Sequence, residues 1–140
     1  MRIFIDTNII LDMLEPTRTG SEYTMMLFEQ ARKRILELFV TTQSIIDSYY
    51  IGSKMGCSRQ EIDTLITWIL THANVRAIDS ADVKRAVESG VDDIEDEAQV
   101  YLADDSGCNF FITKDKGLLK REQFEGISFK TPEQLVGYMM

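Results

Sequence analysis

Short β-type segments alternate with helical segments along the 140-residue chain, and this alternation constrains the fold more than any other feature of the sequence. Strands are predicted at residues 2–6, 35–40, 75–78, 109–113 and 127–130. Helices are predicted between and after them, at residues 9–14, 21–34, 42–55, 58–69, 80–90, 93–105 and from 132 onward. Strands separated by helices run parallel and are covered on both faces. The sequence therefore predicts one domain over residues 1–140, a three-layer α/β/α fold with a central, mainly parallel sheet of four or five strands.

Several helix starts carry recognisable capping residues. Asn8 is expected to cap the first helix, and Ser58 with Glu61 three residues later forms a capping box. Thr131 precedes Pro132, a residue that is favoured at the first helical position. These residues predict where three of the helices begin.

The composition limits the chemistry. Fifteen Lys and Arg against 23 Asp and Glu give a net charge of −8, which argues against a simple nucleic-acid binder with a basic face. His72 is the one imidazole, and the two cysteines form no CxxC pair. No apolar stretch approaches the length of a membrane span. These features predict a cytoplasmic protein without a membrane segment.

Four aspartates fall where a fold of this kind places functional groups. Asp6 ends the first strand, and Asp115 follows the strand at residues 109–113 by two residues. Parallel strands bring both to one edge of the sheet, where ligands of open α/β sheets bind. Asp47 borders the apolar stripe of its helix, and Asp96 lies on a helix with apolar residues on two sides. A buried carboxylate is costly unless it is paired or binds a metal.

The residue types in this group indicate which metal it would hold. Oxygen ligands without histidine or cysteine select Mg²⁺ or Mn²⁺ over zinc, and such ions usually engage phosphates. Metal-assisted phosphodiester hydrolysis is the reaction class that follows. The neighbouring acids Asp92, Glu95 and Glu97 are expected to be solvated at a helix N-terminus, where the helix dipole stabilises them.

Four segments together resemble the PIN domain family, and most of all its small bacterial VapC-type toxins. They are Ile3-Phe-Ile-Asp6-Thr7-Asn8, the helix around Asp47, Asp93-Ile-Glu-Asp96-Glu-Ala98, and Phe111-Ile-Thr113-Lys-Asp115. The resemblance spans nearly the whole chain. It implies a Mg²⁺- or Mn²⁺-dependent endoribonuclease, often a homodimer, that an antitoxin protein silences.

The resemblance also assigns roles to residues of this chain. It implies an acidic catalytic and metal site formed by Asp6, Asp47, Asp96 and Asp115. Supporting polar groups would be Thr7, Asn8, Asp93 and Thr113, although Asn8 fits equally well as a cap alone. The second acid is commonly Glu in this family. The shorter Asp47 leaves direct coordination and a bridging water both open.

Two questions stay open from the sequence. The cations next to and after Asp115 are candidates for binding RNA phosphates, and solvated surface charge explains them equally well; they are Lys114, Lys116, Lys120 and Arg121. The alternative function is a PIN-like module that binds RNA or a partner protein without cleaving. Acids at all four positions favour catalysis over that alternative.

Overall fold

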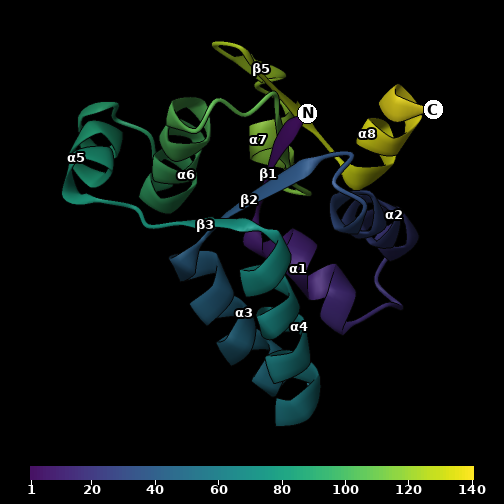
Figure 1. Ribbon diagram of the computed structural model, residues 1–140. Coiled ribbons are helices and arrows are strands. Elements are labelled where there is room, and N and C mark those ends of the chain that lie inside the picture. The colour runs from purple at the N-terminus through teal and green to yellow at the C-terminus, as the bar shows by residue number, and fades with distance from the viewer.

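The strands lie in the order β3-β2-β1-β4-β6-β5 in the computed structural model, which describes residues 1–140 (Figure 1). They are β1 (Arg2–Ile5), β2 (Glu37–Thr41), β3 (Asn74–Arg76), β4 (Phe110–Ile112), β5 (Gln123–Phe124) and β6 (Ile127–Lys130). All neighbouring strands pair in parallel except β5 and β6, which form an antiparallel hairpin at one edge. The predicted mainly parallel sheet is confirmed, with β5 as an additional short strand.

Eight helices connect and cover these strands. They are α1 (Thr7–Leu14), α2 (Ser21–Arg32), α3 (Thr42–Lys54), α4 (Arg59–His72), α5 (Ser80–Glu88), α6 (Ile94–Asp105), α7 (Lys116–Leu119) and α8 (Pro132–Met139). None of them combines the length and the apolar character that crossing a membrane requires. The short α7 lies directly after the segment that carries Thr113 and Asp115, and it was not predicted.

The two faces of the sheet support two separate cores. Ile3 and Ile5 of β1 face a cluster that includes Leu27 of α2 and Leu135 of α8. The intervening Phe4 faces the other side, where Val100 of α6 and Leu118 of α7 pack. Because side chains alternate along a strand, both faces are buried only if both carry helices. The predicted three-layer arrangement is confirmed (Figure 1).

Asp6, and not Asn8, caps the first helix. The Asp6 carboxylate accepts a hydrogen bond from the Thr7 backbone amide at 2.7 Å. The predicted cap at Asn8 is wrong because β1 ends at Ile5 and the helix starts without an intervening turn. The capping box of Ser58 and Glu61 is present as predicted.

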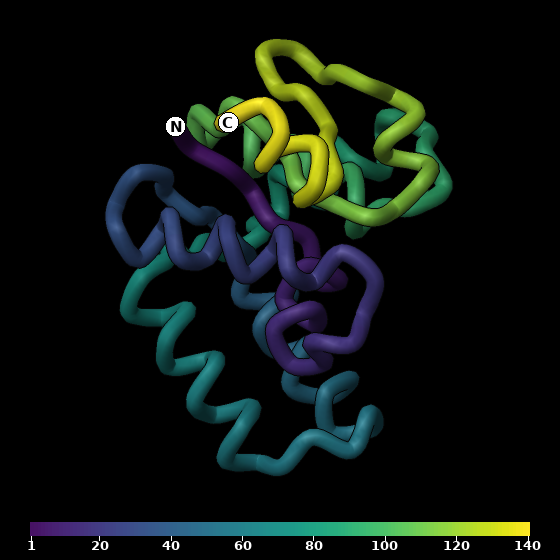
Figure 2. Tube along the Cα trace, turned by 90° about the vertical axis from the view of Figure 1, so that its right-hand side faces the viewer, coloured from purple at the N-terminus to yellow at the C-terminus, as the bar shows by residue number.

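The helices α3 and α4 pack closely around a glycine. Gly52 of α3 is buried, and a Cβ atom added there would lie 2.8 Å from Leu14 Cδ1 and 3.3 Å from Ile62 Cδ1. Those side chains are themselves buried and have little room to move. Figure 2 shows the turn between α3 and α4 at the opposite end of the molecule from both termini.

We expect Gly52→Ala to lower the melting temperature although alanine is the better helix former. The gain in helix propensity is about 1 kcal/mol, whereas overpacking a filled site costs roughly 1–3 kcal/mol. The control is Gly137→Ala in α8, where a Cβ meets no atom within 4 Å. Thermal unfolding should show the control at or above wild type. A Gly52→Ala protein as stable as Gly137→Ala would contradict this account of the packing.

Candidate metal centre

The site forms where the two central strands end. Asp6 follows β1 and Thr113 follows β4, and these strands are neighbours in the sheet. The Thr113 hydroxyl donates a hydrogen bond to Asp6 Oδ2 at 2.9 Å. The Asp6 amide donates to the carbonyl of Ile112 at 3.1 Å, which continues the pairing of the strands by one residue. The Asp6 carboxylate is therefore buried and fixed by both its oxygens.

Two further carboxylates cap the helices that start at this edge. Asp115 Oδ1 accepts from the Gly117 amide at 2.7 Å at the start of α7, and its own amide donates to Thr113 Oγ1 at 3.0 Å. Asp93 Oδ1 accepts from the Asp96 amide at 3.0 Å at the start of α6. Carboxylates favour helix N-termini because unpaired amides and the helix dipole stabilise negative charge there.

The pKa shifts show that these carboxyl groups lie close together. Burial raises the pKa of Asp96 to about 8, and the charges of Asp6 and Asp93 and a hydrogen bond with Asp115 act in the same direction. Burial also raises the pKa of Asp6, against the lowering effect of the hydrogen bonds from Thr113 and the Thr7 amide. The structure thus brings together side chains from three separate segments, which carry Asp6, Asp93 with Asp96, and Asp115.

Asp47 lies at the rim of this group, next to Glu95. Asp47 of α3 is half-buried and accepts from Gln43 Nε2 at 2.9 Å. Burial raises the pKa of Glu95, and the charge of Asp47 raises it next. Glu95 is exposed, as expected, and the charge of Asp47 places the two carboxylates near each other. The one feature of the sequence that places Glu95 near the site is its position directly before Asp96.

Thr7 ties the helix that carries Asp47 to the first helix. The Thr7 hydroxyl donates to Ser44 Oγ at 2.9 Å, and Thr41 Oγ1 donates to the same oxygen at 3.0 Å. Asp47 lies one turn after Ser44 on α3. Thr7 thus orients the helix that presents Asp47. The Asn8 Oδ1 atom is buried without a hydrogen-bond partner, so its amide has an unused acceptor at the start of α1.

None of these acids forms an ion pair. The salt bridges of the structure include none of Asp6, Asp47, Asp93, Glu95, Asp96 and Asp115. The donors are all oxygen atoms, which suits Mg²⁺ or Mn²⁺ and does not suit a zinc site. No three acidic, histidine or cysteine side chains surround one point as metal ligands do. The residues fit a hard cation that binds few carboxylates directly and keeps several waters.

Two of the four candidate RNA-binding cations are committed to buried carboxylates. Lys114 Nζ lies 2.7 Å from Asp12 Oδ1. Arg121 Nη1 lies 2.8 Å from Glu97 Oε2, and a second bond of 3.3 Å joins Nη2 to Oε1. Glu97 is buried, so the expectation that it is solvated is wrong. Lys116 and Lys120 remain exposed and without an ion-pair partner.

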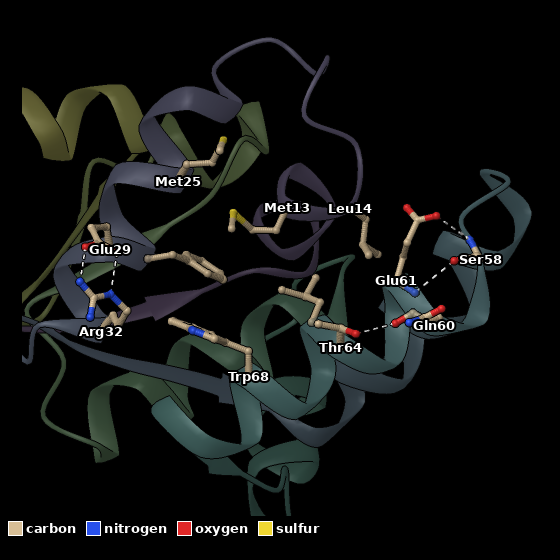
Figure 3. Close-up of a pocket in the computed structure, with 12 residues that line it drawn as sticks. Met13, Leu14, Met25, Glu29, Arg32, Ser58, Gln60, Glu61, Thr64 and Trp68 are labelled. Atoms are coloured by element: carbon tan, nitrogen blue, oxygen red, sulfur yellow. Dashed lines mark hydrogen bonds and ion pairs between the residues drawn. The ribbon is translucent and has the colours of Figure 1, made fainter.

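A separate groove lies between α1, α2 and α4 (Figure 3). Its volume is about 830 Å³, and its walls include Met13 of α1, Met25 of α2 and Trp68 of α4. It contains none of the candidate site residues. The acidic site at the carboxyl edge of the sheet is therefore separate from this groove.

Comparisons with known proteins agree with this description. The family model for the PIN domain matches residues 2–117. Ribonuclease VapC1 of Aquifex aeolicus (strain VF5) is 24% identical over 120 residues, which is 82% of each chain.

Solved structures with the same fold include two bacterial proteins and an archaeal one. Mycobacterium tuberculosis VapC20, described as a sarcin-ricin loop cleaving toxin, has a TM-score of 0.67 at 12% identity, over 81% of this chain and 90% of its own. PAE2754 of Pyrobaculum aerophilum has a TM-score of 0.65 at 18% identity, over 99% and 89%. VapBC2 of Rickettsia felis, bound to a DNA fragment from its promoter, has a TM-score of 0.62 at 12% identity, over 94% and 98%.

Fold and site together define an α/β protein that gathers carboxylates at the carboxyl edge of a parallel sheet. With a family model matching residues 2–117, the chain belongs to the PIN domain family.

The raised pKa of Asp96 predicts a stability that depends on pH. Between its ordinary value near 3.8 and about 8, the folded state binds a proton that the unfolded state has released, so stability falls as pH rises through this window. In EDTA, Asp96→Asn should match wild type near pH 4 and melt about 2–6 °C above it at pH 9. Asp105→Asn, on the exposed end of the same helix, is the control. A difference between Asp96→Asn and wild type that does not change with pH would contradict the assignment.

Proposed function

We propose that this protein is a divalent-metal-dependent endoribonuclease that hydrolyses RNA phosphodiester bonds. The observation that carries the proposal is a cluster of carboxylates from separate segments with no lysine or arginine paired to any of them. Such a cluster is unfavourable for folding unless a cation joins it. The name of the Aquifex relative, a ribonuclease, and the description of VapC20 as a sarcin-ricin loop cleaving toxin support the same function.

In this proposal Asp6, Asp47, Asp96 and Asp115 would hold Mg²⁺ or Mn²⁺, some of them through its waters, and Asp93 and Glu95 would add negative charge nearby. When bound, the ion lowers the pKa of a coordinated water and offsets charge on the phosphate. PIN-domain nucleases generally use divalent ions, which supports this assignment.

The chain's own residues orient and protect the site. The Thr113 hydroxyl donates a hydrogen bond to the Asp6 carboxylate and accepts one from the Asp115 backbone amide. One side chain therefore sets the spacing of two carboxylates. Because the pKa of Asp96 is raised to about 8, its carboxyl group would hold a proton near neutral pH, and a bound cation would favour its charged form. Thr7 fixes α3 and through it Asp47.

We further propose that the protein is a cytoplasmic toxin of a toxin–antitoxin pair and a homodimer. The related Rickettsia protein is a VapBC complex on promoter DNA, which supports an antitoxin partner for this chain. Co-expression with the product of a neighbouring reading frame should suppress toxicity and yield a stable complex. A sedimentation coefficient that corresponds to the monomer mass would contradict the proposed homodimer.

Asp96→Asn tests the catalytic proposal directly. We expect wild type to cleave a fluorophore–quencher RNA hairpin with Mg²⁺ or Mn²⁺, and Asp96→Asn to lose more than about 100-fold in kcat, because the loss of a metal ligand removes several kcal/mol of transition-state stabilisation. Asp105→Asn should retain wild-type activity. Equal cleavage by wild type and Asp96→Asn would mark the activity as a contaminant. Metal-independent RNA binding without cleavage would favour the non-catalytic module.

Lys116 and Lys120 are the cations left to contact RNA beside Asp115. The double variant Lys116→Gln/Lys120→Gln should raise KM with little change in kcat. The slope of log KM against log salt should fall by about 0.7 for each RNA phosphate that a lysine no longer neutralises. Lys84→Gln, an exposed lysine of α5, is the control. An unchanged salt slope would show that these lysines do not touch RNA.

A further inference from the structure

The carboxylate of Asp12 has no solvent exposure and is the centre of a charged network. Its Oδ1 atom accepts from Lys114 Nζ at 2.7 Å and from Arg18 Nε at 3.0 Å. Its Oδ2 atom accepts from the Thr24 hydroxyl at 2.6 Å. Lys114 Nζ also donates to the carbonyl oxygen of Thr19 at 2.7 Å. The ammonium group of Lys114 is thus bound to α1 and to the loop that precedes α2.

Lys114 lies between two residues of the acidic site. Thr113 on one side holds Asp6, and Asp115 on the other begins α7. Consecutive Cα atoms are about 3.8 Å apart, so a displacement of the Lys114 backbone is transmitted to both neighbours. The buried pair with Asp12 therefore restrains the short segment that carries the Thr113 hydroxyl and the Asp115 carboxylate.

This anchoring is incompatible with a role for Lys114 in gripping RNA. A buried carboxylate that loses one of its cations is left under-compensated, and breaking such a pair is strongly unfavourable. The side chain of Lys114 is only 24% exposed, and its ammonium group binds two internal oxygen atoms. Releasing it toward a phosphate would leave the charge of Asp12 in the interior with one cation fewer.

The other end of the same segment is anchored in the same manner. Arg121, two residues after α7, makes two hydrogen bonds to buried Glu97 of α6. Glu97 is the neighbour of Asp96. One charge pair thus joins the segment to α1, which follows Asp6, and another joins it to α6, which carries Asp96.

We propose that Lys114 is a positioning residue, and that its ammonium group, held by buried Asp12, sets the position of Asp115 and Thr113 relative to Asp6 for binding of a divalent cation. The proposal rests on the proposed function in taking these groups as metal ligands or their supports. Residues that orient metal ligands typically change metal affinity or activity by about 10- to 100-fold when replaced.

Lys114→Met is the first test, because it keeps most of the length of the side chain and removes the charge. We expect the Kd for Mn²⁺, measured by isothermal titration calorimetry, to rise about 10-fold or more. With the RNA hairpin, kcat should fall by a similar factor while KM stays within about twofold. A rise in KM with unchanged Mn²⁺ affinity would identify Lys114 as an RNA contact and overturn the proposal. Lys84→Met removes an exposed lysine and is the matched control.

A second variant separates positioning from stability, since Lys114→Met leaves Asp12 short of a cation. Asp12→Asn/Lys114→Met removes both charges of the pair and keeps a side-chain oxygen that can accept from Arg18 and from the Thr24 hydroxyl. We expect its melting temperature to return close to that of wild type while Mn²⁺ affinity and kcat remain low. Recovery of Mn²⁺ affinity together with stability would show that the pair serves folding alone.

The two proposals fail in different ways. If the wild type binds Mn²⁺ but does not cleave RNA, the proposed nuclease activity is wrong. The effect of Lys114→Met on Mn²⁺ affinity then still tests whether Lys114 positions the metal ligands. If the wild type cleaves RNA in a manner that needs Asp96, and Lys114→Met leaves both Mn²⁺ affinity and kcat unchanged, only the positioning role is wrong.

Discussion

The hydrogen bond from Thr113 to Asp6 joins the ends of the two central strands, and the rest of the acidic site is arranged around it. Parallel pairing of β1 with β4 brings these two residues to the same level of the sheet. The same threonine oxygen accepts a hydrogen bond from the backbone amide of Asp115. The register of the sheet therefore sets the position at which α7 starts. A shift of that register by one residue would turn both side chains toward the opposite face.

The unpaired carboxylates at this edge of the sheet destabilise the folded protein, and the ion pairs formed by neighbouring acids offset part of that effect. Burial and mutual repulsion raise the pKa of Asp6, Glu95 and Asp96, which means that their charged forms are disfavoured in the folded protein. Two neighbouring carboxylates, Asp12 and Glu97, are instead paired with cations. The chain thus separates acids that hold the structure together from acids that are left without a cation.

Much of the fold follows from the sequence, and so does the grouping of the aspartates. The alternation of strands and helices, with Asp6 and Asp115 after adjacent strands, required only the geometry of a parallel sheet. The partners of Lys114 and Arg121 could not be predicted, because each pair joins residues that are far apart in the chain. The strand β5 and the helix α7 are too short for a periodic pattern to develop. Asp6 takes the place of Asn8 as the cap because the first helix begins at Thr7, two residues earlier than the sequence indicates.

Internal pairing of Lys114 and Arg121 has a kinetic consequence for any polyanion that approaches the protein. A molecule of net charge −8 that uses these cations inside its structure repels a polyanion over roughly the Debye length, which is about 8 Å at physiological ionic strength. Electrostatic steering, which accelerates association for proteins of opposite charge to their ligand, works here in reverse. Encounter with such a ligand is therefore slower in dilute salt than in concentrated salt, and selection among ligands depends on the contacts formed after collision and not on long-range attraction.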